Sequence, residues 1–172
     1  MTVREASVED ASTIADLHIR AWQVAYRGIV PDAILDGMSV DARREFWRRV
    51  IGRRTFEPSN DARVWVVEED GVVRGFAATR ACRDADAAPR TGEVHSIYLA
   101  PEAWGRGLGS QLLERAADDL GERDFAPLIL WVIEANTRGR RFYERAGWRP
   151  DGARQPIDFD GTLVDEIRYR RD

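Results

Sequence analysis

EVHSIYLAPEAWGRGLGSQLLERAADDL, residues Glu93–Leu120, is the stretch of the chain that decides its fold. It opens with a run of strand formers, Glu93–Leu99, between Gly92 and Pro101. Three glycines follow at alternate positions, and leucines and alanines then recur at helical spacing, so a helix is predicted to begin within the glycines. Strand, glycine-rich turn and helix N-terminus together favour an anion site, because the unpaired N–H groups of the first helical turn point at the ligand.

Three interpretations compete for this stretch. A connection without a ligand needs one glycine, so three alternating glycines at a helix start argue against it. Gly105-x-Gly107-x-x-Ser110 nearly fits a dinucleotide-binding turn, but that fold starts its glycines directly after the strand, whereas Ala100–Trp104 intervene here. A P-loop is excluded because the chain contains no lysine. The third interpretation is a pyrophosphate cradle of another architecture.

This third interpretation rests on a resemblance. The stretch resembles the coenzyme-A-binding core of the GNAT superfamily of N-acetyltransferases, whose pattern is Arg/Gln-x-x-Gly-x-Gly/Ala at the start of a helix. The matching window is Trp104-Gly-Arg-Gly107-Leu-Gly109, with Trp in the first position. A second block, Leu128–Trp148, resembles the family's order of strand, Asn, helix carrying Phe-Tyr, and Gly-aromatic. The specific motifs lie within residues 93–148, and the likeness of fold extends over roughly residues 2–170.

The resemblance implies an α+β fold, a mixed and mostly antiparallel sheet flanked by helices, as a single domain over residues 1–172. Asp70-Gly71 and Asp160-Gly161 are predicted hairpin turns, and residues 52–61 a polar connection. Predicted strands are Thr2–Ala6, Arg63–Glu69, Val72–Cys82, Glu93–Leu99, Pro127–Ile133, a strand opening at Trp148, and Leu163–Tyr169. Predicted helices run from Ala11 to about Tyr26, over Val40–Ile51, from the glycines to Leu120, and over Asn136–Ala146.

Composition excludes several classes of function. The net charge of −4 over 172 residues gives no indication of a nucleic-acid partner. Cys82 is the only cysteine, and His18 and His95 lack ligand spacing, so no metal site is expected. No apolar run approaches membrane-spanning length. We expect a cytoplasmic protein that does not bind membranes and is a monomer or homodimer.

The resemblance implies that acetyl-CoA is the co-substrate. Backbone N–H groups of the glycine turn would hold its pyrophosphate. In the family the first strand of the motif splays, which frees main-chain groups for pantetheine and the thioester oxygen. Asn136 is either only a helix N-cap or also a hydrogen-bonding partner of pantetheine. The expected cofactor-binding residues are Ile97, Tyr98, Leu99, Gly105, Arg106, Gly107, Leu108, Gly109, Ser110 and Asn136.

Tyr143 is the candidate for proton return to the departing thiolate, a role that the resemblance implies. It lies seven residues after Asn136, so the two share one helical face. Its phenol has a reference pKa of about 10 and is able to donate that proton. Packing beside Phe142 is the alternative role for Tyr143.

The acceptor amine must lose a proton before it attacks a thioester, which requires a base at the edge of the site. Glu93 falls where several family members carry their general base, and His95 is the rival because imidazole titrates nearer neutrality. Strand alternation places Glu93, His95, Ile97 and Leu99 on one face. A surface salt bridge and a core histidine are the structural alternatives for the two residues.

The acceptor site is the part of the active site that the sequence defines least. In the family the loop between the first two helices often lines it, which here corresponds to Trp22–Asp32. Trp22 and Tyr26, with Pro31, are predicted to form an apolar wall, with Asp32 or Asp36 facing an amine. The same aromatics are equally compatible with core positions.

Together these features predict an acetyl-CoA-dependent N-acetyltransferase that acts on a primary amine of a small molecule or peptide. Direct transfer in a ternary complex is expected, because the lone thiol of Cys82 lies outside both motif blocks. The alternative is a non-catalytic acyl-CoA-binding or interaction domain, and Tyr143 and Glu93 argue against it.

Overall fold

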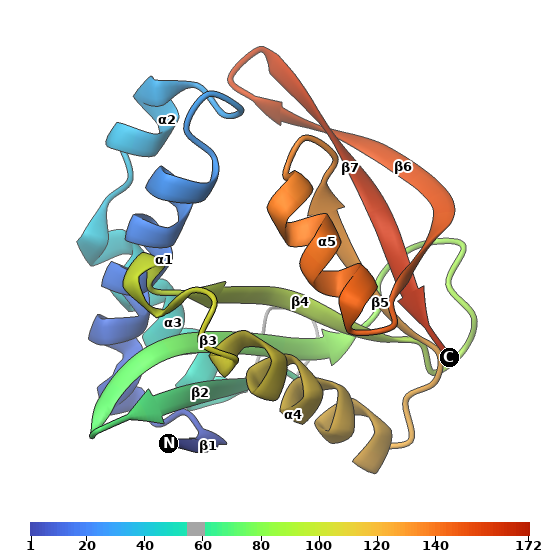
Figure 1. Ribbon diagram of the computed structural model, residues 1–172, viewed down its shortest axis with the longest axis horizontal. Coiled ribbons are helices and arrows are strands. Elements are labelled where there is room, and N and C mark those ends of the chain that lie inside the picture. Colours follow the sequence, from blue (N-terminus) through green and yellow to red (C-terminus); the bar gives the residue numbers. More distant parts are fainter. Residues whose placement is uncertain (55–60) are drawn as a thin grey trace.

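The computed structural model describes residues 1–54 and 61–172, and a seven-stranded sheet forms its centre (Figure 1). The strand order is β1-β2-β3-β4-β5-β7-β6, and all neighbours are antiparallel except β4 and β5. The predicted mixed, mostly antiparallel sheet is therefore confirmed. The strands are β1 Thr2–Glu5, β2 Arg63–Glu69, β3 Val72–Ala81, β4 Gly92–Leu99, β5 Leu128–Ile133, β6 Arg149–Phe159 and β7 Thr162–Arg171.

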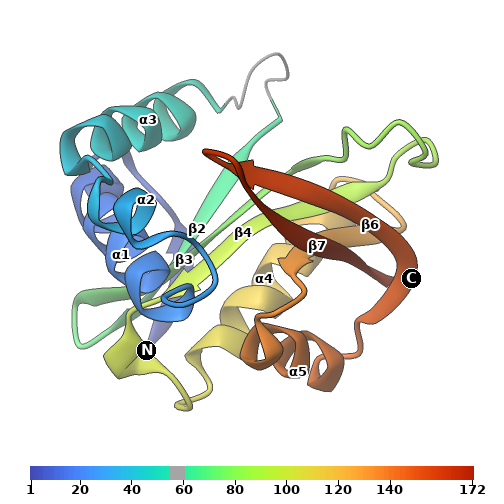
Figure 2. The ribbon, with the colours of Figure 1, turned by 90° about the horizontal axis from the view of Figure 1, so that it is seen from above.

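The helices cover both faces of the sheet. Figures 1 and 2 show α1, α2 and α3 on one side of the strands and α4 and α5 on the other. The short α2 follows Pro31 and was not predicted, because five residues are too few to show helical periodicity. The helices are α1 Ala11–Ala25, α2 Asp32–Asp36, α3 Val40–Arg53, α4 Leu108–Glu122 and α5 Thr137–Arg145, with short 3-10 turns at Val8–Asp10 and Pro101–Ala103. The predicted polar connection falls largely on residues 55–60, which lie outside the described residues.

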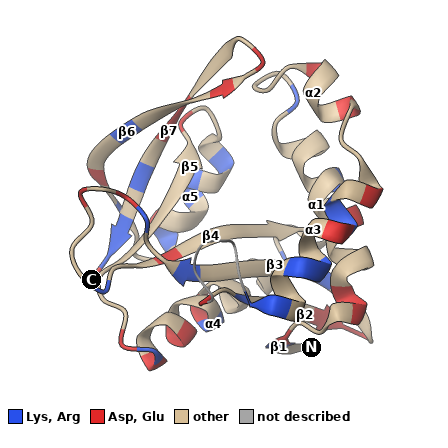
Figure 3. Cartoon of the chain, turned by 180° about the vertical axis from the view of Figure 1, so that it is seen from behind, with Lys and Arg blue, Asp and Glu red and all other residues tan. Residues whose placement is uncertain are grey.

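The main core lies between these layers. The apolar strand β5 sits between β4 and β7, and all its residues except Trp131 are buried, which confirms its predicted central place. Leu112, Leu113 and Leu120 of α4 are at most 1% exposed, as the periodicity of that helix requires. None of the described helices is long and apolar enough to cross a membrane. Figure 3 shows acidic and basic positions interspersed over helices and strands.

The parallel pair β4–β5 opens along its length. The two strands pair at Gly92 with Leu128 and at Glu93 with Ile129, and no later rung joins them within the described residues. In Figure 1 they diverge from that point, leaving a V-shaped gap in the middle of the sheet. The later part of β4 therefore has main-chain groups on its β5 side that no strand pairs with.

A β-bulge interrupts β4 at the mouth of the gap. Val94 and Ser96 oppose consecutive residues of β3, so His95 is the extra residue. Beyond a bulge the alternation of faces reverses, which places Glu93 on the same face as Ser96 and Tyr98. The predicted alternation, with all the odd-numbered residues on one face, was therefore wrong, because a period of two does not continue across an extra residue.

Candidate active site

A cavity of about 1000 Å³ occupies the gap between β4 and β5 and reaches both faces of the sheet. Its wall is built from α1, β3, β4, the glycine turn, β5, α5, β6 and β7. The structure thus brings most of the predicted site residues to one place. Those in the wall are Trp22, Tyr26, Glu93, Ile97, Tyr98, Leu99, Gly105, Gly107, Gly109, Ser110, Asn136 and Tyr143.

Arg106 and Leu108 are the two predicted cofactor residues that do not line the cavity. The Arg106 guanidinium donates to Glu69 at 2.6 Å, and the Leu108 side chain is only 1% exposed within the core. Any contact of either residue with a ligand in the cavity is therefore expected to involve its backbone. The N–H of Leu108, at the first position of α4, is one of the groups that a helix leaves unpaired.

The glycine turn is a backbone cradle at the N-terminus of α4. Gly105 and Gly107 have φ of +75° and +82°, and a Cβ on either would meet nothing within 4 Å. Gly109 differs, since a Cβ there would come within 3.3 Å of the Phe142 ring, so this glycine allows α4 to approach α5. The first two glycines therefore form the turn and leave space for a ligand, whereas the third serves packing.

Trp104 and Arg138 form a pair that the sequence did not reveal. The indole Nε1 of Trp104 donates to the Leu99 carbonyl at 3.1 Å, which anchors the ring beside the splayed end of β4. The Arg138 guanidinium, from the first turn of α5, lies 3.8 Å from the centre of that ring. A cation–π contact thus holds a positive charge on the cavity wall next to the glycine turn.

Asn136 and Tyr143 lie at opposite ends of α5. Asn136 Oδ1 accepts the Gly139 N–H at 3.0 Å, which confirms the N-cap interpretation, and the residue also lines the cavity. Burial, with a smaller contribution from nearby Tyr98, raises the pKa of Tyr143 well above its usual value. The phenol of Tyr143 therefore remains protonated at neutral pH and is able to act as a proton donor.

Glu93 belongs to a three-residue cluster with Arg80 and His95. Its carboxylate accepts from Arg80 Nε at 2.6 Å and Nη2 at 3.2 Å, and lies 3.3 Å from His95 Nδ1. Burial alone would raise the pKa of this carboxyl, but the hydrogen bonds to His95 and Arg80 outweigh it and lower the pKa below the ordinary value. The Glu93 side chain is 6% exposed and that of His95 33%, so the imidazole is the member that reaches solvent.

On the α1 side the cavity has an aromatic wall. Trp22 contacts Tyr26 edge to face at 5.1 Å and Phe159 of β6 at 6.2 Å. Asp32 and Asp36, expected to face an amine, instead bind Arg27 at 2.9 and 2.8 Å and lie outside the cavity wall. That expectation was wrong, because an arginine five residues before Asp32 occupies both carboxylates.

Five charged wall residues were absent from the predicted site: Arg80, Asp84, Arg138, Arg145 and Glu166. Arg80 stands directly opposite Glu93 in the β3–β4 register, so the hairpin pairing would have revealed it once the bulge was known. Asp84 comes from the loop after β3 and Glu166 from β7, and no local pattern connects either residue with the motif blocks.

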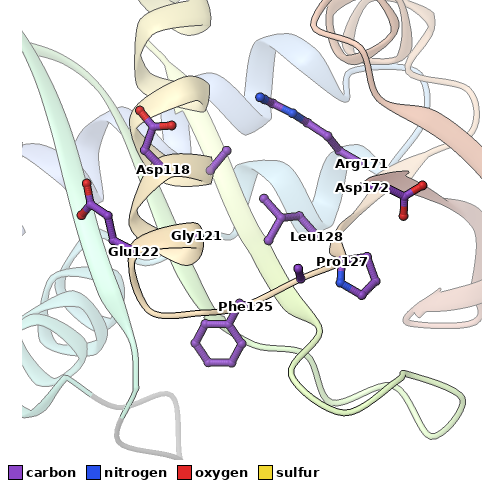
Figure 4. Close-up of a pocket in the computed structure, with 10 residues that line it drawn as sticks. Asp118, Gly121, Glu122, Phe125, Pro127, Leu128, Arg171 and Asp172 are labelled. Carbon is purple, nitrogen blue, oxygen red and sulfur yellow. The ribbon is translucent and has the colours of Figure 1, made fainter.

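A second, smaller hollow lies at the other end of α4. Its volume is about 420 Å³, and Figure 4 shows Asp118 and Glu122 of the helix on one side and Leu128 and Arg171 on the other. It contains none of the predicted site residues. The larger cavity is therefore the candidate active site.

Comparison with known proteins identifies the family. The profile of the acetyltransferase (GNAT) family matches residues 29–148, more than half of the chain. The chain belongs to the GNAT family. As a GNAT protein it is an N-acetyltransferase, and its co-substrate is acetyl-CoA.

Individual relatives agree with the family. The chain is 31% identical to the N-acetyltransferase YuaI of Bacillus subtilis over 136 residues, covering 79% of this chain and 73% of YuaI. It is 36% identical to the L-amino acid N-acyltransferase MnaT of Escherichia coli over 151 residues, 86% of this chain and 79% of MnaT. The solved structure of yncA from Salmonella typhimurium with acetyl-CoA is 25% identical, has a TM-score of 0.73, and covers 99% of this chain and 92% of yncA.

The cavity suits acetyl-CoA. Gly105 and Gly107 leave open the space into which a Cβ would project, beside the N–H groups of the first turn of α4, as a pyrophosphate requires. The edge of β4 beyond Glu93 has no strand partner on the β5 side, which leaves main-chain groups for an amide-rich arm. Arg138 adds a positive charge near the turn.

Proposed function

We propose that this GNAT protein acetylates a primary amine of a small molecule or peptide by direct transfer within a ternary complex. The observation that carries the proposal is the single cavity, which joins the glycine cradle on the α4 side to the Glu93–His95 pair on the α1 side. Acetyl-CoA supplies the activated thioester. Both reactants are thereby expected to occupy one cavity at the same time.

The Glu93–His95 pair removes the proton from the acceptor in this proposal. Arg80 binds Glu93 through two nitrogens and holds its pKa low, so this carboxylate is better suited to orient a base than to be one. With Nδ1–H donating to Glu93, His95 presents Nε2 as the basic nitrogen. His95 is thus the proposed general base, with Glu93 positioning it, and Glu93 acting directly is the second candidate.

Tyr143 protonates the departing thiolate in the proposed reaction. Its raised pKa keeps the phenol protonated at neutral pH, so the O–H is available to donate to the sulfur as the thiolate departs. Cys82, which would be needed for an acetylated enzyme, is not in the cavity wall, and burial raises the pKa of its thiol. These two features favour direct transfer over a covalent route.

The proposal is tested by incubating the protein with acetyl-CoA and a panel of primary amines while thiol release is recorded. Initial rates at varied concentrations of both substrates should give intersecting lines, and Cys82→Ser should retain full activity. Intact-mass measurement after incubation with acetyl-CoA alone should show no added acetyl group. Parallel lines, or an acetylated protein that transfers to amine, would overturn direct transfer.

His95→Gln separates the two candidate bases. It should lower kcat with acetyl-CoA affinity nearly unchanged, whereas Glu93→Gln should lower kcat less. Full activity of His95→Gln would return the role of base to Glu93.

We further propose that residues 1–172 act as one domain and that the reaction takes place in the cytoplasm.

A further inference from the structure

The acceptor side of the cavity contains one carboxylate without a counter-ion. Glu93 is paired with Arg80, and Asp84 with Arg168 at 2.8 Å. Glu166 of β7 lines the same cavity, and its hydrogen-bond partner is the neutral Gln155 amide at 3.2 Å. Within the described residues, no arginine or histidine nitrogen lies within 4.0 Å of Glu166.

The setting of Glu166 makes the missing counter-ion costly. Its side chain is half-buried, and burial, reinforced by the negative charges of Glu93 and Asp84, raises the pKa of this carboxyl above its ordinary value. A half-buried carboxylate without a counter-ion is destabilised relative to water, and a cation bound beside it relieves that cost. Glu166 is therefore suited to binding a positively charged group.

We propose that the acceptor is a diamine, with one amino group acetylated near His95 and a second, charged one bound by Glu166. This inference rests on the proposed transfer function and names its substrate class. The aromatic wall of Trp22 and Phe159 would cover the methylene chain between the two nitrogens.

The Glu93–His95 pair and Glu166 lie at separate points along the acceptor side. In the sheet, Glu93 pairs with Ile129 and Glu166 with Ile133, four residues farther along β5. Four residues of strand span about 13 Å. Because β4 and β5 are parallel, His95 lies farther along in the same direction, so the interval from the base to Glu166 is shorter than this, and a short alkyl chain with an amino group at each end would bridge it.

The same arrangement disfavours free amino acids. An α-carboxylate on the acceptor would enter a region that already contains Glu93, Asp84 and Glu166, and Arg80 is bound by Glu93 through two nitrogens. Like charges at such distances repel each other. The proposed acceptor class therefore differs from that named for the relative MnaT, an L-amino acid N-acyltransferase.

Three probes that share one carbon chain test the proposal. 1,5-Diaminopentane has both amino groups, 1-aminopentane lacks the second one, and L-lysine adds a carboxylate. We expect kcat/KM for the diamine to exceed that for either other probe by at least about tenfold, the usual effect of one charge-assisted contact. Equal rates for the diamine and the monoamine, or faster acetylation of lysine, would overturn the diamine proposal and leave the transfer function standing.

Glu166→Gln identifies the residue responsible. It should raise KM for 1,5-diaminopentane about tenfold and leave kinetics with 1-aminopentane within twofold, whereas Glu166→Asp should restore part of the preference. Asp165→Asn is the matched control, because it removes the same charge one residue earlier, at an exposed position outside the cavity wall. Unchanged diamine kinetics in Glu166→Gln would refute the assignment.

A binding measurement keeps the inference testable without turnover. Titration calorimetry of 1,5-diaminopentane into the protein saturated with coenzyme A should show binding that weakens about tenfold in Glu166→Gln and is unchanged in Asp165→Asn. Diamine binding that depends on Glu166, without thiol release, would support the diamine site and overturn the transfer function. Absence of diamine binding would overturn the inference.

Discussion

The proposed cofactor side and the proposed acceptor side of the cavity are built in different ways. The cofactor side consists largely of backbone, namely the glycine turn, the first turn of α4 and the unpaired edge of β4, all within Gly92–Glu122. The acceptor side consists of side chains from five elements, including Trp22 of α1, Glu93 of β4, Phe159 of β6 and Glu166 of β7.

This difference indicates which side of the cavity is expected to be shared within the family and which is expected to vary between its members. A backbone cradle needs glycine only at the positions of positive φ. Its neighbouring side chains can therefore be substituted without loss of the cradle. A wall of side chains changes its chemistry with each substitution. The acceptor side is therefore where this GNAT protein is expected to differ from its relatives, and substitutions on the two sides should have different consequences.

The largest effect is expected on the cofactor side, from Gly107→Val. A branched side chain at this position would project into the open space of the cradle and block the approach of a phosphate. Because Gly107 has φ of +82°, valine would also strain the turn, at a cost of about 1–3 kcal/mol. We expect loss of coenzyme A binding by at least about hundredfold and a lower melting temperature.

Gly107→Asn separates blockage from strain. Asparagine tolerates positive φ better than other residues with a side chain, so this variant should melt close to the unmodified protein. It still places a side chain in the cradle and should lose coenzyme A binding in a calorimetric titration. Unchanged affinity in folded Gly107→Asn would show that the phosphate binds elsewhere.

Tyr143→Phe tests the chemistry between the two sides. The substitution keeps the ring and its contact with Phe142, so only the phenolic O–H is lost. A proton donor acts mainly in the transition state, so kcat should fall by about hundredfold, the low end of general-acid effects, with acetyl-CoA affinity nearly unchanged. Phe142→Leu is the control and should reduce stability more than turnover. Full activity of Tyr143→Phe with a working acceptor would leave Tyr143 as a packing residue.

His18, a buried histidine next to the cavity residue Tyr98, should make the free energy of unfolding decrease in acid. His18 stacks on Tyr98 at 4.9 Å and accepts the Trp47 indole N–H at 3.2 Å. Burial, together with the charges of Arg43 and His95, lowers the pKa of His18 to about 3. The unfolded chain therefore binds a proton that the folded chain does not, between a pH of about 6.5 and about 3.

The stability due to neutral His18 is thus complete above pH 6.5 and decreases as the pH falls. Between pH 6.5 and 5 the expected loss is about 2 kcal/mol in the free energy of unfolding. Denaturant titrations at both pH values measure it, and His18→Gln should remove that part of the slope. Equal slopes in His18→Gln and the unmodified protein would disprove the assignment.

The sequence was sufficient for the fold and for the elements that line the glycine-turn side of the cavity, for identifiable reasons. The periodicity of α4, the apolar run of β5 and the Asp-Gly turns are local signals, and the two motif blocks contain the cradle, Asn136 and Tyr143 in contiguous segments. Among the described residues, α2 is the one α-helix that was missed, and it has five residues.

The acceptor side was not predictable in the same way, because its charges meet through tertiary structure. The bulge at His95 moves Glu93 to the face of Tyr98, and no glycine marks this bulge in the sequence. Asp32 was expected to face the amine but pairs with Arg27, and Glu166 reaches the cavity only because β7 lies beside β5. Trp22 and Tyr26 were named correctly as wall residues, whereas their partner Phe159 was not.

The smallest effect concerns a pair of side chains on the cofactor side, Arg138 and Trp104. Arg138 lies over the Trp104 ring on the cavity wall, and Arg115 lies over the Trp65 ring at 4.4 Å outside it. If the charge of Arg138 attracts the phosphates of the co-substrate, Arg138→Gln should weaken coenzyme A binding about fivefold, which corresponds to about 1 kcal/mol for a partly exposed charge. Arg115→Gln removes the same kind of contact away from the cavity and should leave the affinity unchanged. The weakening should also diminish at high salt, because screening reduces the contribution of an exposed charge. Equal calorimetric affinities for the two variants would show that the Arg138–Trp104 pair only joins α5 to the glycine turn, and that the backbone cradle binds the phosphates without it.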